Sequence, residues 1–547
     1  MNNCCKYFFY TACFIICFFL PGVSAGQGRV EVEVSGLSDD YYLAPIGRNG
    51  VLLFGETGKN IRNVTPYTFT KYNVNFAKEW EVSVDVKYRL FPLKYVYDEQ
   101  YEKLYVLMAR GSTSYVADKY QVLELDIATK KISLLNGTFK RRTHIADFVV
   151  ASGRVYFGGY TLPPNSDLFF KTMYSLMLFY VPAFFGSLNL KLKPFLCAAD
   201  FTKGTLTEYP LNMKGNARVL SITTDKVTDD VNVLFSEKIS RKDITQGIIV
   251  LDSLGTCTEK IVFADSGNID ILTGLLTRVD SNNRIVIGAF VPRPQGYKES
   301  YFNESIHNPA SSGFYCAGLD ENKQTFLKLY PYTKFTNFYN FLSDRSQMRI
   351  KKKMARRQAR GKEYQAKYYV LVNDLIVQEK SLIFLAEAYY PEYETRCETA
   401  FNPNGTTYQR CYTVFTGYRV THAIAAAFDN SGELLWDNSF EVMDVVSYEL
   451  KPRVKALADG NELLLVYANN GELKSKVIAG GKVVESKNTV KIEAAHSSDK
   501  VKENYGSGIS YWYNNYFIAY GYQKIKNLSA GNNTKKRVFY FNKIAYK

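Results

Sequence analysis

Residues 427–436 read Ala-Phe-Asp-Asn-Ser-Gly-Glu-Leu-Leu-Trp, and this stretch decides the fold. An apolar segment ends at Asp429, a polar turn with Gly432 follows, and a second apolar segment begins at Leu434. An Asp side chain accepts hydrogen bonds from the backbone just beyond it, and Gly adopts positive φ without steric cost. The stretch therefore predicts a tight turn that joins two antiparallel strands.

The same pattern of apolar segment, polar residue and short turn recurs, in clear or degenerate form, at Asn75, Asp126, Asp200, Asp252, Asp320, Gly480 and Asn542. Neighbouring copies without an insertion between them lie about 51 residues apart, a period that suits one four-stranded propeller blade. The eight turns predict an all-β fold, a single β-propeller of about eight four-stranded blades over residues 26–547. Seven blades with an irregular segment is the alternative.

The last blade lacks a strand, because the chain ends soon after Ala545. Residues 29–35 read Arg-Val-Glu-Val-Glu-Val-Ser, the strict alternation of a half-buried strand. We expect this segment to supply the missing outer strand and to close the ring, which protects the sheet edges.

The copy at residues 427–436 resembles the repeat of PQQ-type propellers, in which a small residue and Asp precede a Gly turn and a Trp follows. The resemblance covers about ten residues of one blade, because the other blades lack the Trp. It implies a propeller fold and does not carry a quinone site over to this sequence.

The first 25 residues have the plan of a secretory signal peptide. Lys6 is the basic residue, residues 8–20 are apolar, and Val23-Ser24-Ala25 provides the small residues of a cleavage site after Ala25. The apolar run is too short to span a bilayer comfortably. We therefore expect an exported protein, located in the periplasm, the outer envelope or the extracellular space.

The composition favours strands, with 43 Tyr and 36 Phe residues, and the net charge is +15. A strongly basic surface suits an anionic partner: a protein, a membrane surface or an anionic glycan. Solubility alone would explain the charge equally well. Export makes a nucleic-acid partner improbable.

Five of the nine cysteines lie outside the signal segment. Cys397 and Cys411 flank a turn-forming Asn-Pro-Asn-Gly sequence, and export permits oxidation, so we predict a disulfide between them. Cys197, Cys257 and Cys316 lie in apolar strand contexts and are expected to be buried thiols.

Four insertions interrupt the repeats, at residues 162–193, 292–312, 335–367 and 391–418. Each falls either between the second and third strands of a blade or between two blades. Both kinds of loop emerge on the same face of a propeller, so the insertions should share one face, where binding usually resides.

The first insertion is apolar and aromatic from Leu168 to Leu190, with Pro182 inside it. Blade strands on both sides exclude a simple membrane span, so packing on the propeller, dipping into a bilayer and contact with a partner protein remain open. The aromatic and Met side chains available for a partner are Phe169, Phe170, Met173, Phe179, Phe184 and Phe185.

The third insertion is expected to contain a helix, since Phe338, Phe341, Leu342, Met348 and Ile350 recur at roughly helical intervals. Its second half is basic. Beside an apolar insertion, such a run resembles an interfacial anchor for anionic lipid or a docking site for an acidic partner, although a solvated charge run is the simpler explanation. The partner-binding candidates are Lys351, Lys352, Lys353, Arg356, Arg357 and Arg360.

The sequence gives little support for catalysis. Its four histidines are scattered without metal-ligand spacing, and no nucleotide-binding or hydrolase motif stands out, so we expect neither a metal nor a cofactor. Our first hypothesis is a non-enzymatic interaction or scaffold module at the cell envelope, docking a membrane or protein partner through the inserted face. The alternative is a propeller that binds or cleaves polysaccharide.

Overall fold

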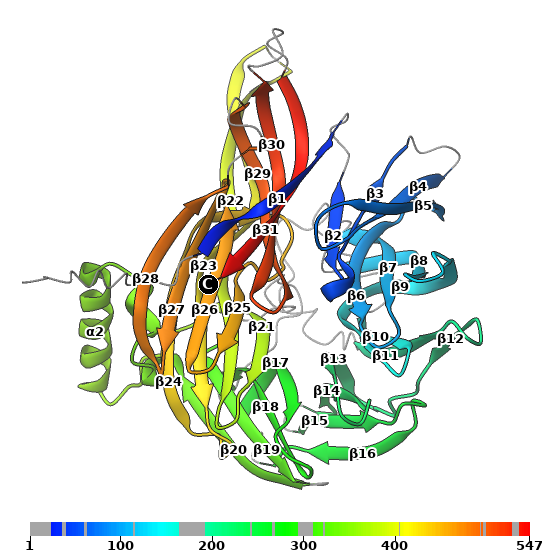
Figure 1. The fold of residues 1–547 in the computed structure, drawn as a ribbon. Coiled ribbons are helices and arrows are strands. Elements are labelled where there is room, and N and C mark those ends of the chain that lie inside the picture. Colours follow the sequence, from blue (N-terminus) through cyan, green and yellow to red (C-terminus); the bar gives the residue numbers. More distant parts are fainter. Residues whose placement is uncertain are drawn as a thin grey trace, which may run out of the picture.

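The structure is a computed structural model. It describes residues 23–34, 40–58, 63–112, 115–162, 192–240, 243–264, 268–293, 310–320, 323–403, 405–492, 494–495, 499–527 and 535–546. Antiparallel sheets dominate this part of the chain and follow one another around a common centre (Figure 1).

Six of the sheets have four strands and one has seven. The seven-stranded sheet combines two blades, because the first half of the long strand β9 (Ile132–Ala151) pairs with β8 and its second half pairs with β10. The described chain therefore forms eight blades of four strands, as the repeat predicts. Blades one to three contain β2 (Tyr41–Pro45), β3 (Val51–Glu56), β4 (Val64–Tyr72), β5 (Lys78–Lys87), β6 (Phe91–Asp98), β7 (Lys103–Ser112), β8 (Tyr115–Asp126), β9, β10 (Arg154–Thr161), β11 (Lys193–Asp200) and β12 (Thr205–Glu208).

The later blades follow the chain in the same way. Blades four and five contain β13 (Asn216–Thr224), β14 (Val231–Lys238), β15 (Ile244–Leu251), β16 (Cys257–Val262), β17 (Ile269–Arg278), β18 (Asn283–Pro292), β19 (Gly313–Asp320) and β20 (Lys323–Pro331). Blades six to eight contain β21 (Tyr369–Val377), β22 (Leu382–Phe401), β23 (Thr407–Phe428), β24 (Leu434–Ser447), β25 (Lys455–Asp459), β26 (Glu462–Asn469), β27 (Glu472–Ala479), β28 (Lys482–Lys491), β29 (Asp499–Tyr513), β30 (Tyr516–Asn527), β31 (Lys535–Tyr546) and β1 (Val23–Glu33).

The hydrophobic core is divided between the blades. Eight clusters of buried apolar side chains each draw on two neighbouring blades. One of them joins the last blade to the first, with Ile518 and Phe539 against Leu43 and Leu53. The ring is therefore closed by packing of the same kind that joins its other blades.

The N-terminal strand completes the last blade, as its alternation predicts. β1 pairs antiparallel with β31, in register from Arg29 opposite Asn542 to Glu33 opposite Val538 (Figure 1). β1 begins at Val23, two residues before the expected cleavage point, so cleavage after Ala25 would leave this register intact. The signal peptide itself stays a prediction, because residues 1–22 lie outside the described residues.

The turn at Asp429 has the predicted chemistry. Its carboxylate accepts hydrogen bonds from the backbone N–H groups of Ser431 and Glu433, at 2.9 and 2.8 Å. Gly432 closes the turn at φ 78°, where a side chain would be strained.

Two expectations are wrong. Asn542 lies within β31 and forms no turn, because the fourth strand of the last blade comes from the N-terminus and no turn is needed there. Cys257 is exposed, since it begins β16, a sheet-edge strand with mostly exposed residues, whereas Cys197 and Cys316 are buried.

Helices are few in the described residues. They are the 3-10 helices η1 (Gly47–Asn49), η5 (Tyr332–Lys334) and η6 (Phe338–Phe341) and the α-helix α2 (Asp344–Gln358). None of the helices in this part of the chain combines the length and apolar character that crossing a bilayer requires.

Candidate functional site

The segment 332–368, here called the crossover, links blade five to blade six and carries the basic run. Its first part is aromatic and buried: Tyr332 and Phe338 are both 0% exposed. Phe335, Phe338 and Phe341 recur every three residues, the period of a 3-10 helix. This part accordingly forms η5 and η6, and the α-helix begins only at Asp344.

Hydrogen bonds hold the start of the crossover against β24. The buried Asp437 carboxylate accepts the backbone N–H groups of Thr336 and Asn337, at 2.8 and 2.7 Å. The Ser439 hydroxyl donates to the carbonyl of Asn337 at 2.9 Å. Burial raises the pKa of Asp437, and the backbone donors partly offset that effect.

The end of the crossover is fixed on the neighbouring blade. Tyr368 and Ser311 exchange both backbone hydrogen bonds, at 2.7 and 2.9 Å. The Tyr332 hydroxyl donates to the Ser311 hydroxyl at 3.0 Å. The two ends of the crossover are therefore tied to the same residue, and helix α2 between them projects outward (Figure 1).

His422 on β23 lies beneath this anchor. Phe341 stacks on its ring at a centroid distance of 3.6 Å, and Nδ1 lies 2.9 Å from the Thr421 hydroxyl. Burial lowers the pKa of His422 to about 3. The imidazole is therefore neutral near pH 7 and serves as an aromatic packing surface.

Helix α2 follows this anchor, and most of its residues are exposed and none is buried (Figure 1). Its Arg, Lys, Met and Gln residues are good helix formers. The helix dipole favours an acidic residue in the first turn and basic residues in the last turn. Helix α2 has Asp344 in its first turn and Arg356 and Arg357 in its last turn.

Helical spacing divides the α2 cations into two groups. Arg345, Arg349, Lys352 and Arg356 recur at intervals of three and four residues, which places them on one face. That face points outward, because the half-buried Ile350 and Met354 lie opposite. None of these four cations has a carboxylate partner within the described residues.

The remaining basic candidates differ in their contacts. Lys353 and Arg357 lie over the ring of Tyr364, at 5.3 and 5.9 Å from its centroid. Lys351 is exposed on the opposite flank, and Arg360 is exposed just beyond the helix. The sequence-based candidates omitted Arg345 and Arg349, which the helical period would have added.

Residues 391–418 form an extended hairpin, where we expected a loop. The pairing of β22 with β23 continues to the tip of the hairpin, where Phe401 lies opposite Thr407, and Cys397 lies opposite Cys411. The two cysteines form the predicted disulfide, with an S–S distance of 2.09 Å. Two-stranded ribbons are marginal in water by themselves, so the covalent bond compensates for the missing third strand.

The two faces of the hairpin differ in charge. Register places Glu394, Arg396, Glu398 and Arg410 on one face. The other face is uncharged from Tyr393 to Phe401 along β22 and from Thr407 to Phe415 along β23. In Figure 1 the hairpin projects far from α2, so these two insertions do not form one continuous surface.

The apolar insertion falls outside the part of the chain that the structure describes. Residues 163–191 lie outside the described residues, and with them the six candidates Phe169, Phe170, Met173, Phe179, Phe184 and Phe185. Most of the 292–312 insertion lies outside as well. Within the described chain, no group of three or more His, Cys, Asp or Glu side chains could hold a metal ion.

No protein-family model matches the chain, and no curated protein gives a significant sequence match. Similar solved structures include the polysaccharide lyase Uly1, at 10% identity and a TM-score of 0.39, with 95% of this chain and 99% of that chain covered. A PL25 ulvan lyase aligns at 9% identity and a TM-score of 0.36, over 80% of this chain and 89% of its own. The β-propeller domain of the Trilobed protease from Pyrococcus furiosus aligns at 7% identity and a TM-score of 0.31, over 82% and 97%. All three scores are below 0.5, so no activity is transferred from these structures to this chain.

Proposed function

We propose that the protein is an exported, non-enzymatic interaction propeller that docks an acidic partner protein through helix α2. The observation that carries the proposal is the outward row of Arg345, Arg349, Lys352 and Arg356, exposed and without carboxylate partners in the described chain. Arg binds carboxylates through a planar, bidentate fork, so three Arg side chains in such a row favour an acidic surface. The disulfide fits an oxidising compartment.

The outward face of α2 favours a protein over insertion into a bilayer. An interfacial helix needs a continuous apolar face. Here Ile350 and Met354 are already half-buried, and among the apolar side chains of α2 it is Met348, 63% exposed, that faces solvent. Binding through α2 is therefore electrostatic and should weaken as salt screens it.

The test uses immobilised poly-glutamate, anionic vesicles and heparin as three probes. Reversing the outward pair, Lys352→Glu with Arg356→Glu, should weaken poly-glutamate binding by about tenfold or more, the loss of roughly 1.4 kcal/mol. The matched control is Lys353→Glu with Arg357→Glu, an equal charge change on the flank that contacts Tyr364, and it should have the smaller effect.

If both double variants lose poly-glutamate binding equally, the outward face of α2 is not a docking face. The overall positive charge of the protein would then explain the binding. Heparin binding that is stronger than poly-glutamate binding and is lost in the Lys352→Glu and Arg356→Glu variant would favour the polysaccharide alternative. Salt-insensitive binding to vesicles would favour a membrane anchor elsewhere in the chain.

A further inference from the structure

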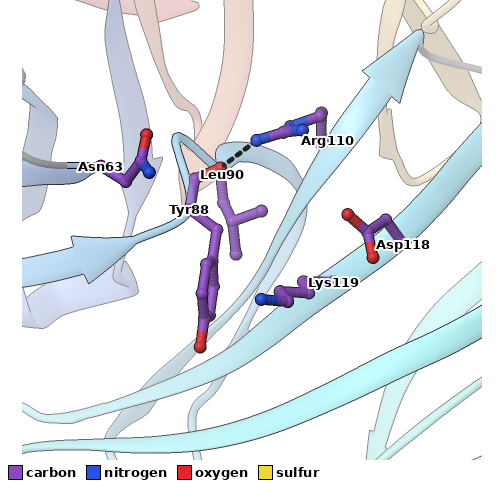
Figure 2. A pocket seen from close by; sticks show the side chains of 6 residues that line it. All are labelled: Asn63, Tyr88, Leu90, Arg110, Asp118 and Lys119. Carbon is purple, nitrogen blue, oxygen red and sulfur yellow. Dashed lines mark hydrogen bonds between the residues drawn. The ribbon is translucent and has the colours of Figure 1, made fainter.

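A small cavity lies between blades one and two, away from the basic helix. It holds about 160 Å³ and is lined by Asn63, Tyr88, Leu90, Arg110, Asp118 and Lys119 (Figure 2). Pockets for drug-sized ligands hold roughly 300 Å³ or more, so this one has room for a single small ring or less. Buried Leu90 provides an apolar wall, and the other lining side chains are polar or aromatic.

Two cations reach this cavity from β7 and β8. The Arg110 guanidinium donates to the carbonyl of Tyr88 at 2.9 Å, which fixes its orientation (Figure 2). The Lys119 ammonium lies 3.9 Å from the centroid of the Tyr88 ring. Neither cation pairs with a carboxylate in the part of the chain that the structure describes.

The backbone at Tyr88 presents these groups in an unusual conformation. Tyr88 and Arg89 are consecutive left-handed residues, with φ of 68° and 52°. Turns of this kind are normally built from Asn and Gly. The opposing residue Asn63 is also left-handed, and its carbonyl accepts the N–H of Tyr88 at 2.7 Å. The turn therefore aims the Tyr88 carbonyl at Arg110 and its ring at Lys119.

The charges of the cavity select the ligand class. Arg110 and Lys119 attract a carboxylate, whereas Asp118 accepts hydrogen bonds only and opposes a bare anion. A fitting ligand carries one negative group and hydroxyl donors, and its charge balances the net +1 of the three side chains. A zwitterionic amino acid would leave that net charge unbalanced. We propose that this cavity binds one acidic sugar residue, a hexuronate, with the carboxylate at Arg110 and Lys119 and a hydroxyl at Asp118.

The test titrates the full-length protein with D-glucuronate, D-glucose, glycine and inorganic sulfate, by calorimetry and saturation-transfer NMR. Glucuronate should bind, and glucose should bind at least about tenfold more weakly, because a charge-assisted hydrogen bond is lost. Arg110→Gln and Lys119→Gln should each weaken glucuronate binding by about tenfold. Asp118→Asn should weaken glucuronate binding but strengthen sulfate binding.

Lys482→Gln, an equal charge change at the exposed first residue of β28 on another blade, is the matched control and should bind glucuronate normally. Thermal unfolding of each variant separates lost binding from lost folding. Absence of glucuronate binding, or normal binding by both cation variants, would overturn the proposal. If sulfate or glycine binds as tightly as glucuronate, the ligand of the cavity is a bare anion or an amino acid and not a sugar. The Lys352→Glu and Arg356→Glu double variant should leave this binding unchanged, so the two proposals fail independently.

Discussion

The crossover and the hairpin are both insertions into blade six or its border, yet they are stabilised in opposite ways. The crossover buries Tyr332 and Phe338 completely and ties its backbone to Asp437 and Ser311. The hairpin leaves most residues between Tyr393 and Tyr412 exposed and relies on the bond between Cys397 and Cys411.

The two insertions should therefore contribute differently to the free energy of unfolding of the ring. The crossover shares its side chains with a cluster that joins blades five and six, so loosening it should weaken the ring. The hairpin beyond Pro391 adds little to any shared core, so loosening it should remain local. Substitutions in the two insertions test that contrast, and their expected effects on the global free energy of unfolding range from several kcal/mol to almost none.

The largest expected effect comes from Phe338→Ala. Removing this buried ring should lower the free energy of unfolding by about 3–5 kcal/mol. The matched variant Phe401→Ala truncates a ring that is 75% exposed on the hairpin. It should change the free energy of unfolding by less than about 0.5 kcal/mol. Urea denaturation of both variants provides the measurement, and equal losses would remove the distinction between the two insertions.

Acid should weaken the crossover through His422. Its pKa is lowered to about 3 by burial in the folded state, while the unfolded chain protonates near 6.5. The stabilisation is therefore complete above pH 6.5 and is lost progressively as the pH falls toward 3, by about 3 kcal/mol at pH 4. His422→Phe keeps a ring against Phe341 and should flatten this part of the stability profile. A slope unchanged by the substitution would assign the acid sensitivity to other groups.

Removal of the disulfide should act locally. Cys397→Ser with Cys411→Ser removes a constraint of roughly 3 kcal/mol in the chain-entropy description, but from hairpin opening and not from global unfolding. Trypsin should then cut after Arg396 and Arg410 faster than in the parent protein, while the melting temperature stays nearly unchanged. A large drop in melting temperature would show that the hairpin supports the ring.

The smallest expected effect is that of the outward α2 cations on stability. Because no α2 residue is buried, Lys352→Glu with Arg356→Glu should change the free energy of unfolding by less than about 0.5 kcal/mol. Denaturant unfolding at two salt concentrations measures this change. A larger loss would mean that α2 contributes to the fold as well as to docking.

Local chemistry made much of the fold predictable. The turn at Asp429 and the alternation after Arg29 encode their structures in a few residues. The count of eight turns predicted the blade number, although Asn542 forms no turn. The disulfide followed from the turn between its cysteines. Asn542 was misleading, because it lies inside β31, whose next strand in the blade comes from the N-terminus and not from a following turn.

The sites were less predictable because they depend on contacts between distant segments. The basic run was visible in the sequence, but its outward face could be identified only from the partial burial of Ile350 and Met354 on the opposite side of α2. The cavity depends on left-handed backbone at Tyr88 and Arg89, residue types that do not signal such turns. Its lining residues come from two blades that repeat analysis treats separately.

The pairing of β1 with β31 also sets a schedule for biosynthesis. The Arg29 side chain donates to the side chain of Asn542, 513 positions along the chain. At 5–20 residues per second, the first strand waits roughly 25 to 100 s for its partner to be made. Throughout that interval the N-terminal strand is an unpaired edge and the ring is open. A chain terminated early would keep that strand edge exposed permanently. Such a chain should therefore be prone to aggregation or proteolysis.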